Sequence, residues 1–260
     1  MTDFTLFEMS DRRREQLLHR HEFYVAQARK RLFSQFDEHD IKAEADSVAR
    51  EWLETHPGLC NSENSGETIL EAAGDMRNGH YQLLNKMRAA TIKMAVVSFF
   101  HDWEKSLRQW LVEQINHWHY GDEACSAIWK KPLIDLYDLL ECFGWSLKSA
   151  SYFSDLNACR LVVNVCKHGN GPSLTELAEN YPQYIDKSME DFFGKEFESW
   201  FRPTHENLRI SDEDLGRFSN AILGFWCDVP SDVHASQVTK LPDWLEQAIK
   251  TDNEKKALAK

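Results

Sequence analysis

The sequence lacks the features that mark secreted, disulfide-linked and membrane-spanning proteins. Its six cysteines form no C-x-x-C pair, which favours reduced thiols, most of them small core residues, over a disulfide framework or a zinc knuckle. The longest apolar runs, such as residues 94–100, are far too short to span a bilayer. Residues 1–20 carry four acids and no uninterrupted apolar run, unlike a signal peptide or a membrane anchor. We therefore expect a cytoplasmic protein without a membrane partner.

Positive charge is also scarce, because the 260 residues carry a formal net charge of −12. This charge repels nucleic acid at long range, so we expect no general DNA binding, and any action on RNA requires a local basic site. Aromatic residues are abundant instead, with nine tryptophans and fifteen phenylalanines that need a packed interior or an interface. The apolar content is sufficient for one large domain or two small ones.

Glycine and proline are absent from residues 11–56, where apolar residues recur at helical spacing and Ser10 can cap the start. A shorter helix is expected over residues 68–77, and Asn78 with Gly79 is typical of a turn. We place a domain boundary at this turn. A long core helix is then predicted over residues 80–120, with a broad apolar stripe.

The remaining chain also favours helices, so the predicted fold class is all-α, a helical bundle. Further helices are expected over residues 132–143, 155–168, 173–180, 212–226 and 242–249. Ser154 and Ser211 are placed to cap two of them, and Ser173 with Glu176 has the pattern of a capping box. Residues 208–210 favour a short extended piece, and the charged tail from Thr251 is expected to fray.

The helix expected before Gly169 carries a narrow polar strip, and it is otherwise apolar. At about 100° per residue, one arc of the helix holds the polar residues Asn157, Arg160, Asn164, Lys167 and His168. Desolvating such groups is costly unless they meet partners, water or a ligand. A purely structural interpretation stays open: Lys167 and His168 before Gly169 are an ordinary helix stop, and Arg160 could pair with an acid such as Glu104.

Arg160, Asn164 and His168, followed by Gly169-Asn170-Gly171 and then Ser173 and Leu177, resemble the signature helix of HEPN-type proteins. These are all-α domains that often act as metal-independent ribonucleases. Residues 98–107 resemble an early core helix of this family, and residues 208–226 resemble a closing helix. The resemblance divides the chain into an N-terminal helical region (1–79), a HEPN-like core (80–229) and a C-terminal connector with a short helix and a frayed tail (230–260).

The resemblance implies RNA as a ligand and cleavage without metal or cofactor. His168 would transfer a proton, Arg160 would stabilise charge on a phosphate, and Asn164 would orient His168 or hold a phosphate oxygen. Substrate contacts are expected from Lys167, Asn157 and Asn170, with Glu104 in support.

A helix would separate Arg160 from His168 by about 12 Å along its axis, so we expect a homodimer that pairs these helices antiparallel. By resemblance, such proteins occur in bacterial toxin–antitoxin and phage-defence modules, where a second protein restrains them. The alternative is a catalytically silent helical sensor, adaptor or protein-binding module. A metal enzyme that uses the scattered histidines is a third possibility, and it would contain stoichiometric metal when purified.

Overall fold

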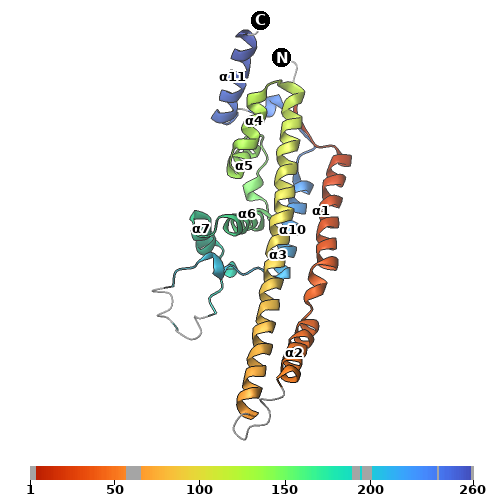
Figure 1. The fold of residues 1–260 in the computed structure, drawn as a ribbon. Helices are drawn as coiled ribbons and strands as arrows, with labels where there is room; N and C mark the ends of the chain where they lie inside the picture. Colours follow the sequence, from red (N-terminus) through yellow and green to blue (C-terminus); the bar gives the residue numbers. More distant parts are fainter. Residues whose placement is uncertain (1–3, 57–65, 189–193, 195–200, 239, 259–260) are drawn as a thin grey trace.

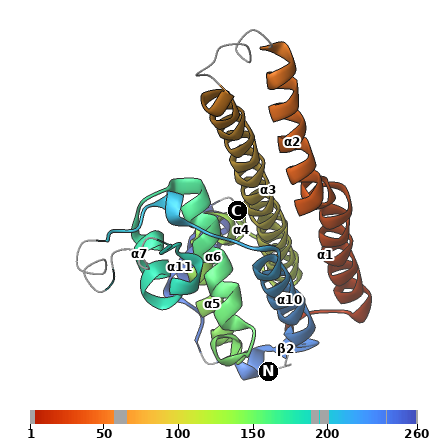
Figure 2. The ribbon, with the colours of Figure 1, turned by 90° about the horizontal axis from the view of Figure 1, so that it is seen from below.

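The computed structural model describes residues 4–56, 66–188, 194, 201–238 and 240–258 (Figures 1 and 2). The predicted all-α class is confirmed, since helices dominate and the described sheet has two short strands. Helix α3 (Gly66–Trp118) is 53 residues long and runs through most of the molecule. No described helix is both long enough and apolar enough to cross a membrane.

The turn predicted at Asn78 and Gly79 is wrong, because α3 continues through both residues. Helix α2 (Glu38–Thr55) lies along this part of α3 and is linked to it by several polar contacts. The imidazole Nε2 of His80 lies 2.8 Å from Glu44 Oε1, and the Tyr81 hydroxyl donates to Glu38 at 2.9 Å. These contacts outweigh the cost of about 1 kcal/mol for a glycine inside a helix. The division of the chain at residue 79 stays a prediction.

The segment of helical spacing over residues 11–56 is helical, but it is divided into two helices. Helix α1 (Asp11–Arg31) ends before a short 3₁₀ helix, η1 (Phe33–Phe36), and α2 then begins. The carboxylate of Asp37 accepts a hydrogen bond from the His39 N–H at 2.9 Å and so caps α2, while Phe36 is buried. The predicted cap at Ser10 is confirmed, because its hydroxyl accepts from the Arg13 N–H.

The molecule has two regions, which we call the arm and the body. The arm is α2 together with residues 66–90 of α3, and it projects away from the other helices (Figures 1 and 2). The body contains the aromatic core, in which the Phe225 ring lies 5.1 Å from the Trp103 ring and 4.9 Å from the Trp145 ring between centroids. The expected aromatic interior is therefore present in the body.

Two strands join the ends of the chain in the body. Strand β1 (Thr5–Glu8) pairs antiparallel with β2 (Asp232–His234), and Phe7 of β1 is buried in the core. The other elements of the body are α4 (Asp122–Lys130), α5 (Leu133–Cys142), η3 (Leu147–Ser149), α6 (Phe153–His168), α7 (Pro172–Asn180), η4 (Pro182–Tyr184), η5 (His205–Asn207), α10 (Asp212–Asp228), η6 (Ala235–Gln237) and α11 (Asp243–Leu258).

Several predicted helix starts are shifted. Helix α6 begins after Tyr152, without the expected cap from Ser154, and α7 begins after Gly171, without a capping box at Ser173. Proline at the first position of α7 favours this earlier start, because its fixed φ suits a first turn. The cap at Ser211 is confirmed, and the extended piece at residues 208–210 appears as a bridge between Leu208 and Ile185.

The frayed tail expected from Thr251 is wrong, because α11 continues to Leu258. Asp252 is buried and holds this helix against α4. Its carboxylate accepts from the N–H groups of Glu123 and Ala124 at 2.9 and 3.0 Å, and it lies 3.0 Å from the His119 Nε2. One carboxylate therefore accepts from two N–H groups in the first turn of α4 and holds α11 in place.

The cysteines are less buried than expected. Of the five described cysteines, all are free and only Cys159 is buried. Cys125 and Cys142 are half-buried, and Cys166 and Cys227 are exposed; Cys60 lies outside the described residues. The prediction that most cysteines are core residues is therefore wrong, because Trp, Phe and Leu side chains fill the interior.

Candidate functional site

The polar strip of α6 lies on one helix, as predicted, and its two ends have different surroundings. Gly169 ends the helix with a φ of 68°, and its N–H donates to the Val165 carbonyl at 2.9 Å. This is the left-handed position that glycine adopts without steric cost. The side chains of Leu161 and Val162 on the opposite arc are fully buried, which fixes the direction in which the strip points.

The N-terminal part of the strip is covered by α7. The Arg160 guanidinium donates to Asn157 Oδ1 at 2.9 Å and to Glu176 Oε1 at 3.0 Å. The Asn157 amide donates in turn to the Tyr181 hydroxyl at 3.2 Å. Only 16% of the Arg160 side chain is exposed. The side chains of Arg160 and Asn157 are thus already occupied by hydrogen bonds within the chain.

Glu104 does not form the suggested pair with Arg160. Its carboxylate accepts two hydrogen bonds from Arg108, at 2.6 and 3.1 Å, one turn further along α3. Arg108 is buried and also donates to the Lys131 carbonyl at 2.9 Å, where α4 ends. Glu104 therefore neutralises a buried cation that joins α3 to α4. The acid that meets Arg160 comes from α7 instead, because α7 folds back against α6 after Gly169.

The two other asparagines of the predicted site have separate roles. Asn164 is half-buried, and within the described residues its amide makes no hydrogen bond. The Asn170 oxygen accepts from the His205 N–H at 2.7 Å and lies 3.1 Å from the His205 Nδ1. Asn170 therefore fixes the loop that carries His205, and Asn164 keeps its polar groups available.

The C-terminal end of the strip is open to solvent. Lys167 and His168 are both exposed, and the His168 ring makes no hydrogen bond to any described residue. The Lys167 Nζ lies 3.5 Å from the Nδ1 of His101 on α3. Burial and the nearby Lys167 ammonium lower the pKa of His101, and Glu104 opposes this shift only in part. A neutral His101 can accept from the Lys167 ammonium, which carries the positive charge of this pair.

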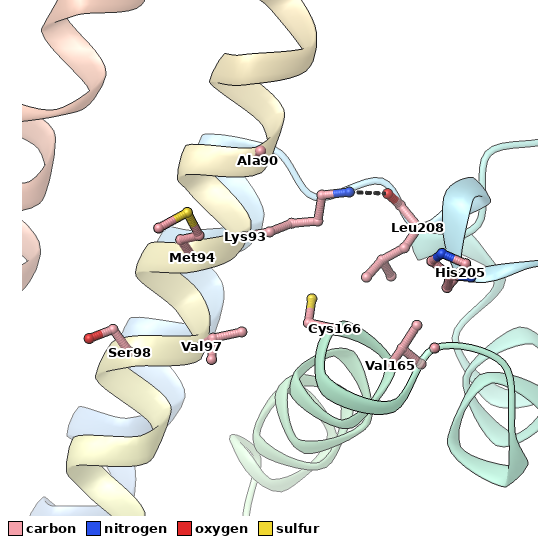
Figure 3. A pocket seen from close by; sticks show the side chains of 10 residues that line it. Ala90, Lys93, Met94, Val97, Ser98, Val165, Cys166, His205 and Leu208 are labelled. Carbon is pink, nitrogen blue, oxygen red and sulfur yellow. Dashed lines mark hydrogen bonds between the residues drawn. The ribbon is translucent and has the colours of Figure 1, made fainter.

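A groove of about 640 Å³ lies beside this open end (Figure 3). Three segments form it: one face of α3, the last turn of α6, and the chain around η5. Its walls are Ala90, Lys93, Met94, Val97, Ser98, Val165, Cys166, Gly169, His205 and Leu208. Figure 3 shows Lys93 reaching across from α3 to the Leu208 carbonyl, to which its ammonium donates at 3.3 Å. The groove has mainly apolar walls with a cation at its edge.

Cys166 opens onto this groove without being an activated nucleophile. The protein around its sulfur desolvates the thiol and raises its pKa, and the Lys93 ammonium opposes this shift only in part. A thiol with a raised pKa stays protonated at neutral pH, and the thiolate is the reactive form. The groove is therefore better suited to binding than to cysteine chemistry.

The scattered histidines do not assemble a metal site in the part of the chain that the structure describes. No group of three or more His, Cys, Asp or Glu side chains there could hold an ion. His119, which the sequence places near His117, faces Asp252 in the interior instead.

Sequence reasoning missed Lys93, His101, Cys166 and His205 as neighbours of the open end of α6. Lys93 and His101 lie on α3, about 70 residues before the end of α6, and His205 lies on a later loop. Their only common property in the sequence is a basic or polar side chain within an acidic protein. Only the packing of three separate segments brings them together.

Comparisons of this chain with family models, curated proteins and solved structures find no match. The likeness to HEPN-type proteins therefore depends on the residues of α6 and its neighbouring segments alone.

Proposed function

We propose that this chain is a HEPN-like helical protein that binds RNA at the C-terminal end of α6. One observation carries the proposal: two lysines, Lys93 and Lys167, meet at the end of α6 where a groove with apolar walls opens, on a chain whose net charge is −12. A local cationic cluster of this kind attracts a polyanion to one place, while the remaining surface repels it. Strong salt dependence of binding is the expected consequence.

The dimensions of the groove favour a single-stranded segment. Its volume of about 640 Å³ is within the range of small-molecule sites, and Met94, Val97 and Leu208 offer an apolar surface to a base. The ammonium of Lys93 lies at the edge of the groove, where a phosphate beside that base could approach, and exposed Lys167 directly follows the lining residue Cys166. Recognition of unstacked bases is the common mode for single-stranded RNA.

Cleavage is a second candidate function, and the exposed imidazole of His168 favours it. That ring could accept the proton of a 2′-hydroxyl while the 2′ oxygen attacks phosphorus and the bond from phosphorus to the 5′ oxygen breaks; the 5′ oxygen then leaves as a hydroxyl with a proton from the imidazolium or from water. Arg160 is about 12 Å away along the axis of α6 and is already paired with Glu176, so within one chain Lys167 is the nearer cation. The toxin–antitoxin and phage-defence roles, and an inhibitory protein partner, follow only from the resemblance.

The binding proposal is tested with a labelled single-stranded RNA of mixed sequence, titrated with protein over a range of salt concentrations. We expect Lys167→Gln and Lys93→Gln to weaken binding and to reduce the slope of log K against log salt by about 0.7 each. Lys42→Gln on α2, an exposed lysine on the arm, is the matched control and should change neither quantity. Equal binding by all three variants, or no binding by the parent at low salt, would overturn the proposal.

The cleavage candidate is tested on the same RNA in the presence of a chelator, with the products separated by size. Loss of cleavage in His168→Ala, with retention in His39→Ala on α2, would support catalysis by His168. If the parent binds RNA and leaves it intact, the catalytically silent alternative holds and the binding proposal stands. Cleavage that persists in His168→Ala would eliminate the catalytic role of this residue.

A further inference from the structure

Helix α3 carries an apolar stripe, which runs from the arm into the body and which nothing in the described structure covers. Four large side chains of α3 are exposed along one line: Met76 (44%), Leu83 (64%), Met87 (60%) and Met94 (71%). Their spacings of seven, four and seven residues place them on one face of the helix, as at the contact positions of a coiled coil. The face packed against α2 is turned from this line by about a quarter of a turn: it carries Ala73, which is buried, and Arg77 and Tyr81, which bond to α2. Ile69, seven residues before Met76, is buried, so the exposed stripe begins at Met76. Large apolar side chains in such a row mark an interaction surface.

We infer that this stripe is where a second copy of the chain binds, with the two α3 helices antiparallel. The stripe is symmetric about Asn85: Leu83 and Met87 lie two residues from it on either side, and Met76 and Met94 lie nine residues from it. A two-fold axis perpendicular to α3, at the level of residue 85 along the helix, therefore places Leu83 against the partner subunit's Met87. It also places Met76 against the partner subunit's Met94. Every apolar residue of the stripe meets an apolar residue, as a self-complementary interface requires.

Charge favours the antiparallel orientation over the parallel one. Asp75 and Lys93 lie on the same flank of the stripe, and Asp75 is exposed. In the antiparallel pair, Asp75 lies within about 3 Å along the axis of the partner subunit's Lys93, so opposite charges face each other twice. In a parallel pair in register, Asp75 and the partner subunit's Lys93 would lie about 27 Å apart along the axis, so this attraction would be lost.

The shape of the molecule agrees with this orientation. The body lies at one end of α3, and the arm projects from it with only α2 beside α3 (Figures 1 and 2). Antiparallel arms put the two bodies at opposite ends of the pair, where they cannot collide. A parallel pair would bring both bodies to the same end.

The stripe also reaches the groove at the end of α6, because Met94 belongs to both. The partner subunit's Met76 would therefore lie at the mouth of the groove and form an additional part of its wall. The pairing itself depends only on the stripe and its flank, and it does not require the groove to bind RNA.

The oligomeric state of the full chain in solution tests the pairing, measured by sedimentation or by light scattering after size exclusion. The parent should be a dimer, and Leu83→Glu should be a monomer with an unchanged helical content, because a charge would sit beside the two-fold axis. Leu70→Glu is the matched control: Leu70 is 68% exposed on the same helix and lies outside the stripe, so this variant should remain dimeric. A monomeric parent, or dimerisation by Leu83→Glu as strong as that of Leu70→Glu, would overturn the inference.

A charge swap tests the orientation. Asp75→Lys alone and Lys93→Asp alone should each weaken the dimer by at least several-fold, and the double variant should recover most of the loss. In a parallel dimer Asp75 and the partner subunit's Lys93 would be too far apart to interact, so no rescue would follow. Dimerisation that is indifferent to both single changes would overturn the antiparallel register. RNA binding, measured separately, would not be decided by either outcome.

Discussion

Helix α3 passes through two regions of the molecule with different surroundings. In the body its apolar side chains are enclosed, and Val96, Leu107 and Leu111 have no exposed surface. In the arm only one face is covered, by α2, and Leu83 and Met87 remain exposed. Apolar residues recur at helical spacing in both regions, so the pattern shows which residues are able to pack but not which of them are buried. The stability of the two regions should differ accordingly.

The largest expected effect is at the centre of the body. Phe225→Ala should lower the free energy of unfolding by about 3 to 5 kcal/mol, because the ring lies between Trp103 and Trp145 and its removal leaves a cavity. Denaturant unfolding followed by tryptophan fluorescence measures this loss. Phe23→Ala on α1 is the control, since that ring is 59% exposed and its truncation should cost no more than about 0.5 kcal/mol. Similar losses in the two variants would mean that the body has no tightly packed centre.

The next effect concerns a buried histidine between α1 and α10. Burial lowers the pKa of His21 from its ordinary 6.5 to about 4, and Asp102 and Ser219 oppose this shift only in part. The unfolded chain therefore takes up the proton first, so stability is complete above pH 6.5 and falls by about 3 kcal/mol as the pH drops toward 4. His21→Gln should flatten this dependence in unfolding experiments at several pH values. An unchanged pH dependence would show that other groups cause the acid sensitivity of the body.

The arm should respond to truncation locally. Ile41 of α2 is buried against α3 outside the main core cluster, and Ile41→Ala should cost about 2 kcal/mol, the low end of the range for a core site. Hydrogen exchange should quicken in α2 and in residues 66–90, with protection in the body unchanged. Equal quickening in both regions would show that the arm and the body unfold as one unit.

The smallest effect is expected at the edge of the body, where Asp252 anchors α11. Burial would raise the pKa of Asp252, but hydrogen bonds from the Glu123 and Ala124 N–H groups and from His119 outweigh it and lower the pKa. This contribution is present above the ordinary value of 3.8 and is lost as the pH falls through the lowered pKa. Asp252→Asn should cost about 1 kcal/mol and quicken exchange in α11. Unaltered exchange in α11 would show that apolar contacts alone hold this helix.

The part of the site that could be predicted from the sequence is the polar strip itself. Helical periodicity placed Arg160, Lys167 and His168 on one arc, and the structure keeps them there. The pairing of Arg160 with Glu176 was not predictable in the same way, because it depends on how α7 folds back after Gly169. The groove was missed for a similar reason, since its walls come from segments that are separated by about 70 and about 35 residues.

Local rules also failed where packing opposed them. The turn at Asn78 and Gly79 was predicted from residue preferences, which amount to about 1 kcal/mol, and the contacts of α2 with α3 exceed that amount. The break between α1 and α2 contains no glycine or proline, and it occurs because Phe36 is buried and Asp37 caps the next helix. Contacts that are remote in sequence keep α3 continuous at Gly79, whereas the break before α2 combines a local cap with the burial of Phe36.

Periodicity and hydrogen bonds within a few residues are enough to predict the helical class, two of the helix caps and the polar face of α6. The tertiary structure alone decided which end of that face stays open, where the groove lies, and which apolar residues of α3 remain exposed. Those properties depend on which distant segments cover a surface, because the burial of a side chain is set by every residue that contacts it, wherever that residue lies in the sequence.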